Sequence, residues 1–274
     1  MKRESFGSRL GFILVSAGCA IGIGNVWKFP YICGAYGGAA FILIYLCFLV
    51  ILGIPVLVAE FAVGRGSHTS VAKCFDKLAP AGSCWKPLKF IGIIGCYMLM
   101  MFYTTVGGWM IYYCVKSLRG DFVGATPEAV TQSFSDMLGN APTMMLWMVI
   151  ICLIGFAVCF MGLQNGIEKI SKVMMSALLI IMVILAVHSV MMEGAGEGIS
   201  FYLIPDFQKI KEAGVGNVVF AALSQSFFTL SIGIGAMLIF GSYLDKSRSL
   251  TGEAVSITVL DTFVALTAGF IIIP

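Results

Sequence analysis

Long apolar segments alternate with short polar ones along this chain. Seven apolar segments are long enough to cross a bilayer, which takes about 20 mostly apolar residues in a helix. They cover residues 10–35, 39–63, 90–115, 143–162, 170–192, 215–241 and 254–274. Their apolar residues run continuously and do not alternate with a period of two, which argues against membrane β-strands. The pattern predicts an all-α polytopic membrane protein.

Composition supports this class and argues against an enzyme. The chain is 59% hydrophobic and 11% charged, whereas a soluble domain carries roughly 25% charged residues. The nine cysteines show no paired CxxC spacing, so neither a zinc site nor a disulfide framework is expected. No HExxH motif occurs, and Asp261 has no second membrane aspartate as a catalytic partner. We expect no organic cofactor and no nucleic-acid partner.

The distribution of basic residues predicts the orientation. The N-terminus and the loops after the second, fourth and sixth segments hold twelve Lys and Arg, against five on the other side. Basic residues favour the cytoplasmic side. We therefore expect a multi-pass protein of the cell's inner (cytoplasmic) membrane with a cytoplasmic N-terminus, and Cys74 should be labelled from the cytoplasm.

Two of the apolar segments contain a Gly-Ile-Gly sequence, at 22–24 and at 233–235. Glycine in a helix interior costs about 1 kcal/mol relative to alanine. Close helix packing is one explanation, and an interrupted helix whose backbone groups line a binding site is another. The two segments lie five spans apart, where paired interruptions point to a transporter site. We expect one five-helix repeat at 1–192 and the incomplete start of an inverted repeat at 193–274.

Four sequence motifs, in order, resemble the neurotransmitter:sodium symporter family. They are RESFGSRLGF at 3–12 with GIGNVWKFPY at 22–31, Glu60 with GRG at 64–66, GIEKISK at 166–172, and QSFFTLSIGIG at 225–235. The resemblance implies an inverted-repeat transporter fold with broken helices 1 and 6. Because members have eleven or twelve spans, we expect a chain truncated after about seven. A missing C-terminal half or a homo-oligomeric copy is the expected protein partner, and the chain alone is not expected to transport.

The resemblance also implies site residues. Sodium ions would be held by Gly18, Ala20, Ile21, Asn25, Thr229 and Asp261. An amino-acid substrate would be bound by Cys19, Ala20, Ile23, Gly24, Leu99, Tyr103, Phe228, Ser231 and Ile234. Arg3, Phe6 and Lys28 would act in gating. For Asp261 two roles stay open, because an acid in this region is either a ligand or a fixed substitute for chloride.

The implied function is sodium-coupled import of a neutral amino acid by alternating access. Gly22 stands where monoamine carriers have an acid, which favours a substrate with its own carboxylate. The pocket is mostly apolar, which favours a hydrophobic or aromatic side chain. A seven-span receptor or a channel-like protein is the alternative, although a cytoplasmic N-terminus is opposite to receptor topology.

Overall fold

The computed structural model describes residues 6–274 and shows two compact helical units. The first unit runs as far as Ile93 and resumes at Glu168, and the second covers Ile94–Ile167. The boundary falls inside one long helix, α6 (Leu88–Arg119). These units divide the chain by compactness, whereas the predicted repeats divide it by symmetry, so the repeat boundary at 192/193 stays a prediction.

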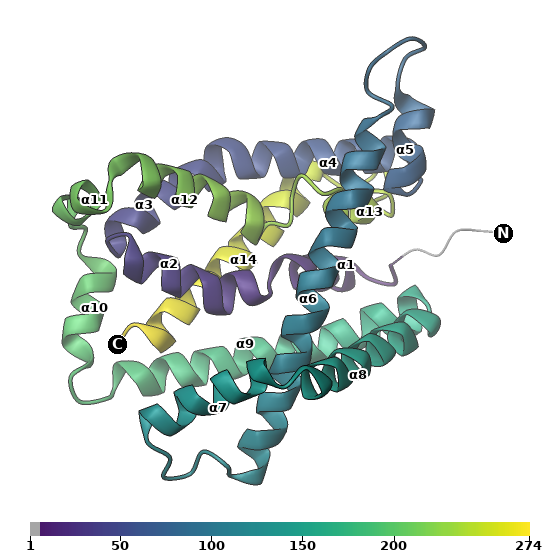
Figure 1. Cartoon of the computed structure of the whole chain (residues 1–274). Helices are drawn as coiled ribbons and strands as arrows, with labels where there is room; N and C mark the ends of the chain where they lie inside the picture. The colour runs from purple at the N-terminus through teal and green to yellow at the C-terminus, as the bar shows by residue number, and fades with distance from the viewer. Residues whose placement is uncertain (1–5) are drawn as a thin grey trace. The chain divides into compact units, whose positions relative to one another are not determined.

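The first unit contains both segments that carry the Gly-Ile-Gly sequences (Figure 1). Its elements are α1 (Arg9–Ala20), η1 (Gly24–Lys28), α2 (Phe29–Ala35), α3 (Ala39–Phe48), η2 (Leu49–Gly53), α4 (Ile54–Ser67), α5 (Val71–Leu78), α9 (Lys169–Val190), α10 (Ala195–Leu203), α11 (Phe207–Ala213), α12 (Val215–Thr229), α13 (Ala236–Gly241) and α14 (Leu250–Ile272). The three η elements, including η3 below, are short π-helical turns that widen the helix locally.

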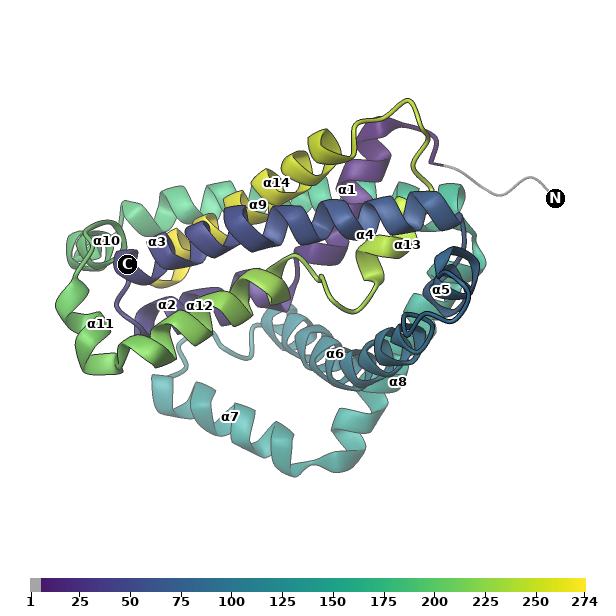
Figure 2. The ribbon, with the colours of Figure 1, turned by 90° about the horizontal axis from the view of Figure 1, so that it is seen from above.

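Helix α14 forms the centre of the first unit. It packs against α1, η1, α2, α4 and α9, and Figure 2 shows it running between α9 and α4. Small residues on α14, including Ala265 and Ala268, are fully buried, which lets neighbouring helices approach closely. Large aromatic side chains such as Phe29, Phe41 and Tyr45 fill the surrounding core.

Among the described residues 6–274, five continuous helical stretches are long and apolar enough to cross a membrane. They are Ala39–Ser67, Leu88–Arg119, Ala141–Phe160, Leu163–Val190 and Leu250–Ile272. The stretches Arg9–Ala20 and Gly24–Ala35 form a sixth span that is bent by 55° at its break. The predicted span 215–241 is not one helix, because α12 ends at Thr229 and α13 begins at Ala236. Length and composition therefore support six of the seven predicted spans, and the sixth predicted span is divided into two short helices.

The second unit consists of α6 from Ile94 onward, α7 (Pro127–Gly139), α8 (Ala141–Phe160) and most of η3 (Leu163–Glu168). Helix α7 begins at the N-cap Thr126, whose side chain accepts a hydrogen bond from the Ala129 amide. Aromatic rings join α6 to α7, with Trp109 and Tyr113 both packed on Phe134. Helices α5, α7, α10 and α11 lie in loops for which no helix was predicted.

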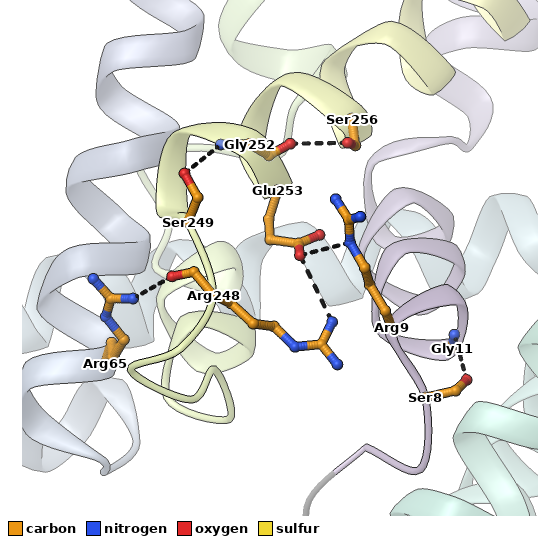
Figure 3. A network of polar contacts seen from close by, with 9 residues as sticks. All are labelled: Ser8, Arg9, Gly11, Arg65, Arg248, Ser249, Gly252, Glu253 and Ser256. Carbon is orange, nitrogen blue, oxygen red and sulfur yellow. Dashed lines mark hydrogen bonds and ion pairs between the residues drawn. The ribbon is translucent and has the colours of Figure 1, made fainter.

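A network of charges near the start of α14 connects three segments of the first unit (Figure 3). Arg9 Nε lies 2.9 Å from Glu253 Oε1, and Arg248 Nη1 lies 3.6 Å from the same oxygen. Arg65 Nη1 donates a 2.8 Å hydrogen bond to the Arg248 carbonyl. Ser249 caps α14 by accepting from the Gly252 amide. The Glu253 side chain is only 3% exposed, so this buried carboxylate holds α1 and the loop before α14 together.

Candidate functional site

The first helix is broken where the sequence predicted. Helix α1 ends at Ala20, and Ile21 has an extended conformation with ψ 110°. The Asn25 Oδ1 atom accepts a 3.3 Å hydrogen bond from the Gly22 amide, which satisfies a donor that the break has freed. The carbonyls of Gly18 and Ala20, predicted to bind sodium, belong to the last turn of α1. Carbonyl oxygens there lack partners within the helix, which makes them suitable cation ligands.

A buried polar cluster joins this break to two other helices. Asn25 Nδ2 donates to Asp261 Oδ1 at 2.8 Å, to the Asp261 carbonyl at 3.1 Å and to Thr229 Oγ1 at 3.0 Å. Thr229 Oγ1 donates to Asp261 Oδ2 at 2.8 Å. All three side chains are fully buried. The fold therefore brings into direct contact three residues that the family resemblance implied as sodium ligands.

The chemistry of this cluster suits a hard cation. Amide, hydroxyl, carboxylate and backbone oxygens are the ligands that such ions prefer, and Asp261 adds one negative charge. A carboxylate inside the membrane-spanning region is costly unless it is paired or functional. Here it accepts hydrogen bonds from Asn25 and Thr229, neither of which is charged. A bound cation would provide the missing countercharge, and the ligand role for Asp261 stays a prediction.

The second break covers Leu230–Gly235 and has its own supports. Ser231 has a positive φ of 52°, and Gly233 and Gly235 have φ of 90° and 79°. Such values are strained for residues with a Cβ atom, so the glycines make the break possible. Ser231 Oγ donates to the Cys19 carbonyl at 3.0 Å, and this bond links the two breaks.

Glu60 on α4 holds the second break in place. Its Oε1 accepts from the Gly233 amide at 2.6 Å and its Oε2 from the Leu238 amide at 3.2 Å. This carboxylate therefore satisfies one donor within the interruption and one in α13. The side chain of Glu60, which the sequence showed only as part of a motif, is half-buried.

Gln225 is a site residue that the sequence did not predict. Its Nε2 donates to the Gly24 carbonyl at 3.0 Å, so it fixes the first break from α12. The side chain is fully buried. A buried glutamine one helical turn before Thr229 was the available signal, because uncompensated amides are rare in membrane helices.

The predicted gating and pocket residues lie in several parts of the chain. Lys28 Nζ lies 4.0 Å above the ring centre of Phe228, a cation–π contact between two predicted site residues. Phe6 packs edge-to-face on Phe12 and Tyr243. Arg3 lies outside the described residues.

The remaining predicted residues of the first unit, Ile23 and Ile234, lie at the two breaks. Leu99 and Tyr103 belong to α6 in the second unit, and their place at the pocket stays a prediction.

Comparisons with known proteins decide the family. Residues 3–129 and 128–274 match the sodium:neurotransmitter symporter family. The chain belongs to this family. Its members are transporters, which confirms that the protein is not classed among enzymes and that it is a multi-pass membrane protein.

Sodium:neurotransmitter symporters from distant organisms resemble the chain along its whole length. It is 36% identical to the uncharacterized sodium-dependent transporter YhdH of Bacillus subtilis, covering 100% of this chain and 59% of YhdH. A similar transporter of Methanocaldococcus jannaschii, MJ1319, is 32% identical over 98% of this chain and 55% of its own length. The chain thus spans less than two thirds of the length of these relatives.

A solved structure confirms the transporter fold. The crystal structure of MhsT in complex with L-phenylalanine superposes with a TM-score of 0.90 at 38% identity. The match covers 99% of this chain and 61% of the MhsT chain. The predicted fold class, an all-α transporter fold with interrupted first and sixth spans, is therefore confirmed.

Proposed function

We propose that this protein imports a neutral amino acid, hydrophobic or aromatic, together with sodium. The observation that carries the proposal is the buried contact of Asn25, Thr229 and Asp261 at the meeting point of the two broken spans. Family membership and the sodium-dependent names of the relatives support sodium as the coupling ion.

The same site offers different groups to the ion and to the substrate. Oxygen atoms of Asn25, Thr229 and Asp261 would receive sodium. Backbone N–H groups at the break near Ile23 and Gly24 would receive the substrate carboxylate, because amides at an interrupted helix carry partial positive charge. Binding both ligands at one break couples them, since each one stabilises the conformation that the other needs.

The substrate side chain is expected to be uncharged. Among the predicted pocket residues in the described part of the first unit none is charged, and Phe228 provides an aromatic wall. Lys28 argues against a cationic substrate side chain. Its ammonium group already lies over the Phe228 ring and would repel a second cation there. Phenylalanine bound to MhsT supports an aromatic substrate.

Uptake into liposomes tests the proposal. The complete gene product that contains residues 1–274 is reconstituted, and uptake of radiolabelled leucine, phenylalanine and tryptophan is followed with an inward sodium gradient. Potassium replaces sodium in the matched control. We expect concentrative, saturable uptake only with sodium. Equal uptake in both gradients would rule out coupling, and stronger competition by glutamate or lysine than by these three amino acids would rule out the substrate class.

A further inference from the structure

A recess in the second unit, lined by both polar and apolar side chains, has no place in the proposed transport site. It has a volume of about 440 Å³ and lies between α6, α7 and the first turn of α8. It lies wholly within residues 112–143, so it belongs to one unit. A volume of this size falls in the range of small-molecule sites, roughly 300–1,000 Å³.

Regular helix geometry builds the walls of this recess. Ala129, Gln132, Ser133 and Asp136 line it from α7 at positions i, i+3, i+4 and i+7, which is one face of a helix. Tyr112 and Lys116 line it from α6 at positions i and i+4. Two helix faces with polar side chains therefore face each other across the recess.

Lys116 is held in a defined position in this wall. Its Nζ atom donates a 2.7 Å hydrogen bond to Ser133 Oγ. The same atom lies 5.4 Å from the ring centre of Tyr112 and 5.6 Å from that of Phe122. Aromatic faces and a hydroxyl group stabilise an ammonium group but do not neutralise it.

Asp136 provides the opposite charge on the same recess. Its Oδ1 accepts a 2.7 Å hydrogen bond from Gln132 Nε2. Within residues 6–274, neither Asp136 nor Lys116 forms an ion pair. Asp136 and Ser133, the partner of Lys116, stand three residues apart on α7, about 4.5 Å along its axis. An ammonium and a carboxylate thus line one recess without pairing with each other.

We propose that this recess binds a small zwitterion. Its carboxylate or phosphate would meet Lys116 and Ser133, and its ammonium group would meet Asp136. A lone anion would be repelled by Asp136 and a lone cation by Lys116, so a molecule with both charges fits best. Two sources share this chemistry, a free α-amino acid and the headgroup of phosphatidylethanolamine.

Hydrogen exchange of α7 reports directly on the recess. The full chain in detergent is measured in potassium buffer without sodium, so the result does not depend on the proposed sodium site. The probes are L-leucine and glycerophosphoethanolamine. The comparison compounds are N-acetyl-L-leucine, which lacks the ammonium, and L-leucinamide, which lacks the carboxylate. We expect slower exchange of the amides in 127–139 with a zwitterion, and about tenfold weaker binding of each singly charged analogue.

Substitutions of the two charges complete the test. Lys116→Gln and Asp136→Asn should each weaken zwitterion binding about tenfold. The control variants Arg119→Gln and Asp121→Asn make the same charge changes outside the recess. They should bind the zwitterion as tightly as the unmodified chain does. Protection by leucine alone assigns a free amino acid, protection by glycerophosphoethanolamine alone assigns the lipid headgroup, and protection by both assigns the shared chemistry. The proposal would be overturned if neither zwitterion slowed exchange of the amides in 127–139. It would also be overturned if both recess variants were protected as strongly as the unmodified chain.

Discussion

The Asn25 amide donates a 2.8 Å hydrogen bond to the Asp261 carboxylate, although 236 residues separate them in sequence. This contact connects the broken first span to the central helix α14. Thr229, at the end of α12, contacts both Asn25 and Asp261. Three segments therefore meet at one buried carboxylate, and the first two predictions follow from its charge and its donors.

Replacing Asp261 by asparagine should weaken sodium activation of transport about tenfold or more, because the cluster loses its only negative charge. The measurement is the sodium concentration for half-maximal uptake, with and without added chloride. Restoration by chloride would assign Asp261 as a fixed charge substitute, and failure of chloride would assign it as a ligand. Sodium activation unchanged in Asp261→Asn would exclude both roles.

The variants Asn25→Ala and Thr229→Ala should each weaken sodium activation by about 1–3 kcal/mol, or roughly 5- to 150-fold. Because both groups contact Asp261 and each other, the double variant should lose less than the two single losses combined. Thr267→Ala is the matched control, since its hydroxyl donates to the Phe263 carbonyl of its own helix and to no other group among residues 6–274. Strict additivity would show that Asn25 and Thr229 act at separate places.

Gly64→Ala should destabilise the protein by about 1–3 kcal/mol, because it overpacks the contact between α4 and α13. A Cβ atom at Gly64 would overlap the Leu238 carbonyl oxygen and lie 2.8 Å from the Ser242 nitrogen. Gly216→Ala on α12 is the control, since its added Cβ would have no atom within 4 Å apart from its chain neighbours and the nearby backbone of its own helix. Thermal unfolding in detergent should show a lower midpoint for Gly64→Ala only. A midpoint as high as that of the control would contradict the close packing.

Glu253→Gln should destabilise the fold by about 1–2 kcal/mol, because a carboxylate that is 3% exposed faces Arg9 and Arg248. The loss stays moderate because Arg9 is 61% exposed and water screens its charge. Asp76→Asn breaks the exposed pair with Lys89 and should cost less than about 1 kcal/mol. Thermal unfolding of the two variants gives the comparison, and equal losses would show that burial of Glu253 has no energetic role.

Cysteine labelling should detect the orientation through Cys84 and not through Cys74. Cys74 is fully buried, its Sγ donates to the Val71 carbonyl, and burial raises the pKa of its thiol, so little reactive thiolate forms. Cys84 in the same loop is exposed. A membrane-impermeant maleimide should label Cys84 only from the cytoplasmic side, with Cys84→Ser as the control. Labelling of Cys84 from outside would reverse the predicted orientation.

Much of the fold follows from local sequence signals. Apolar length predicted the spans, because lipid requires each backbone segment to satisfy its own hydrogen bonds. The two Gly-Ile-Gly sequences predicted the two breaks, since glycine tolerates the positive φ found at Gly233 and Gly235. The loop helices escaped prediction because their apolar stripes are short, as in the eight residues of α5.

The sequence by itself determined the class and the breaks, since these depend on residue type and local periodicity, and its resemblance to a family pointed to three members of the buried cluster. Only the tertiary structure decided which groups meet. It placed Asp261 against Asn25 and Thr229, Gln225 against the carbonyl of Gly24, and Glu60 against the amides of the second break. Such contacts join segments distant in sequence, and helix packing, which no local pattern encodes, sets their geometry.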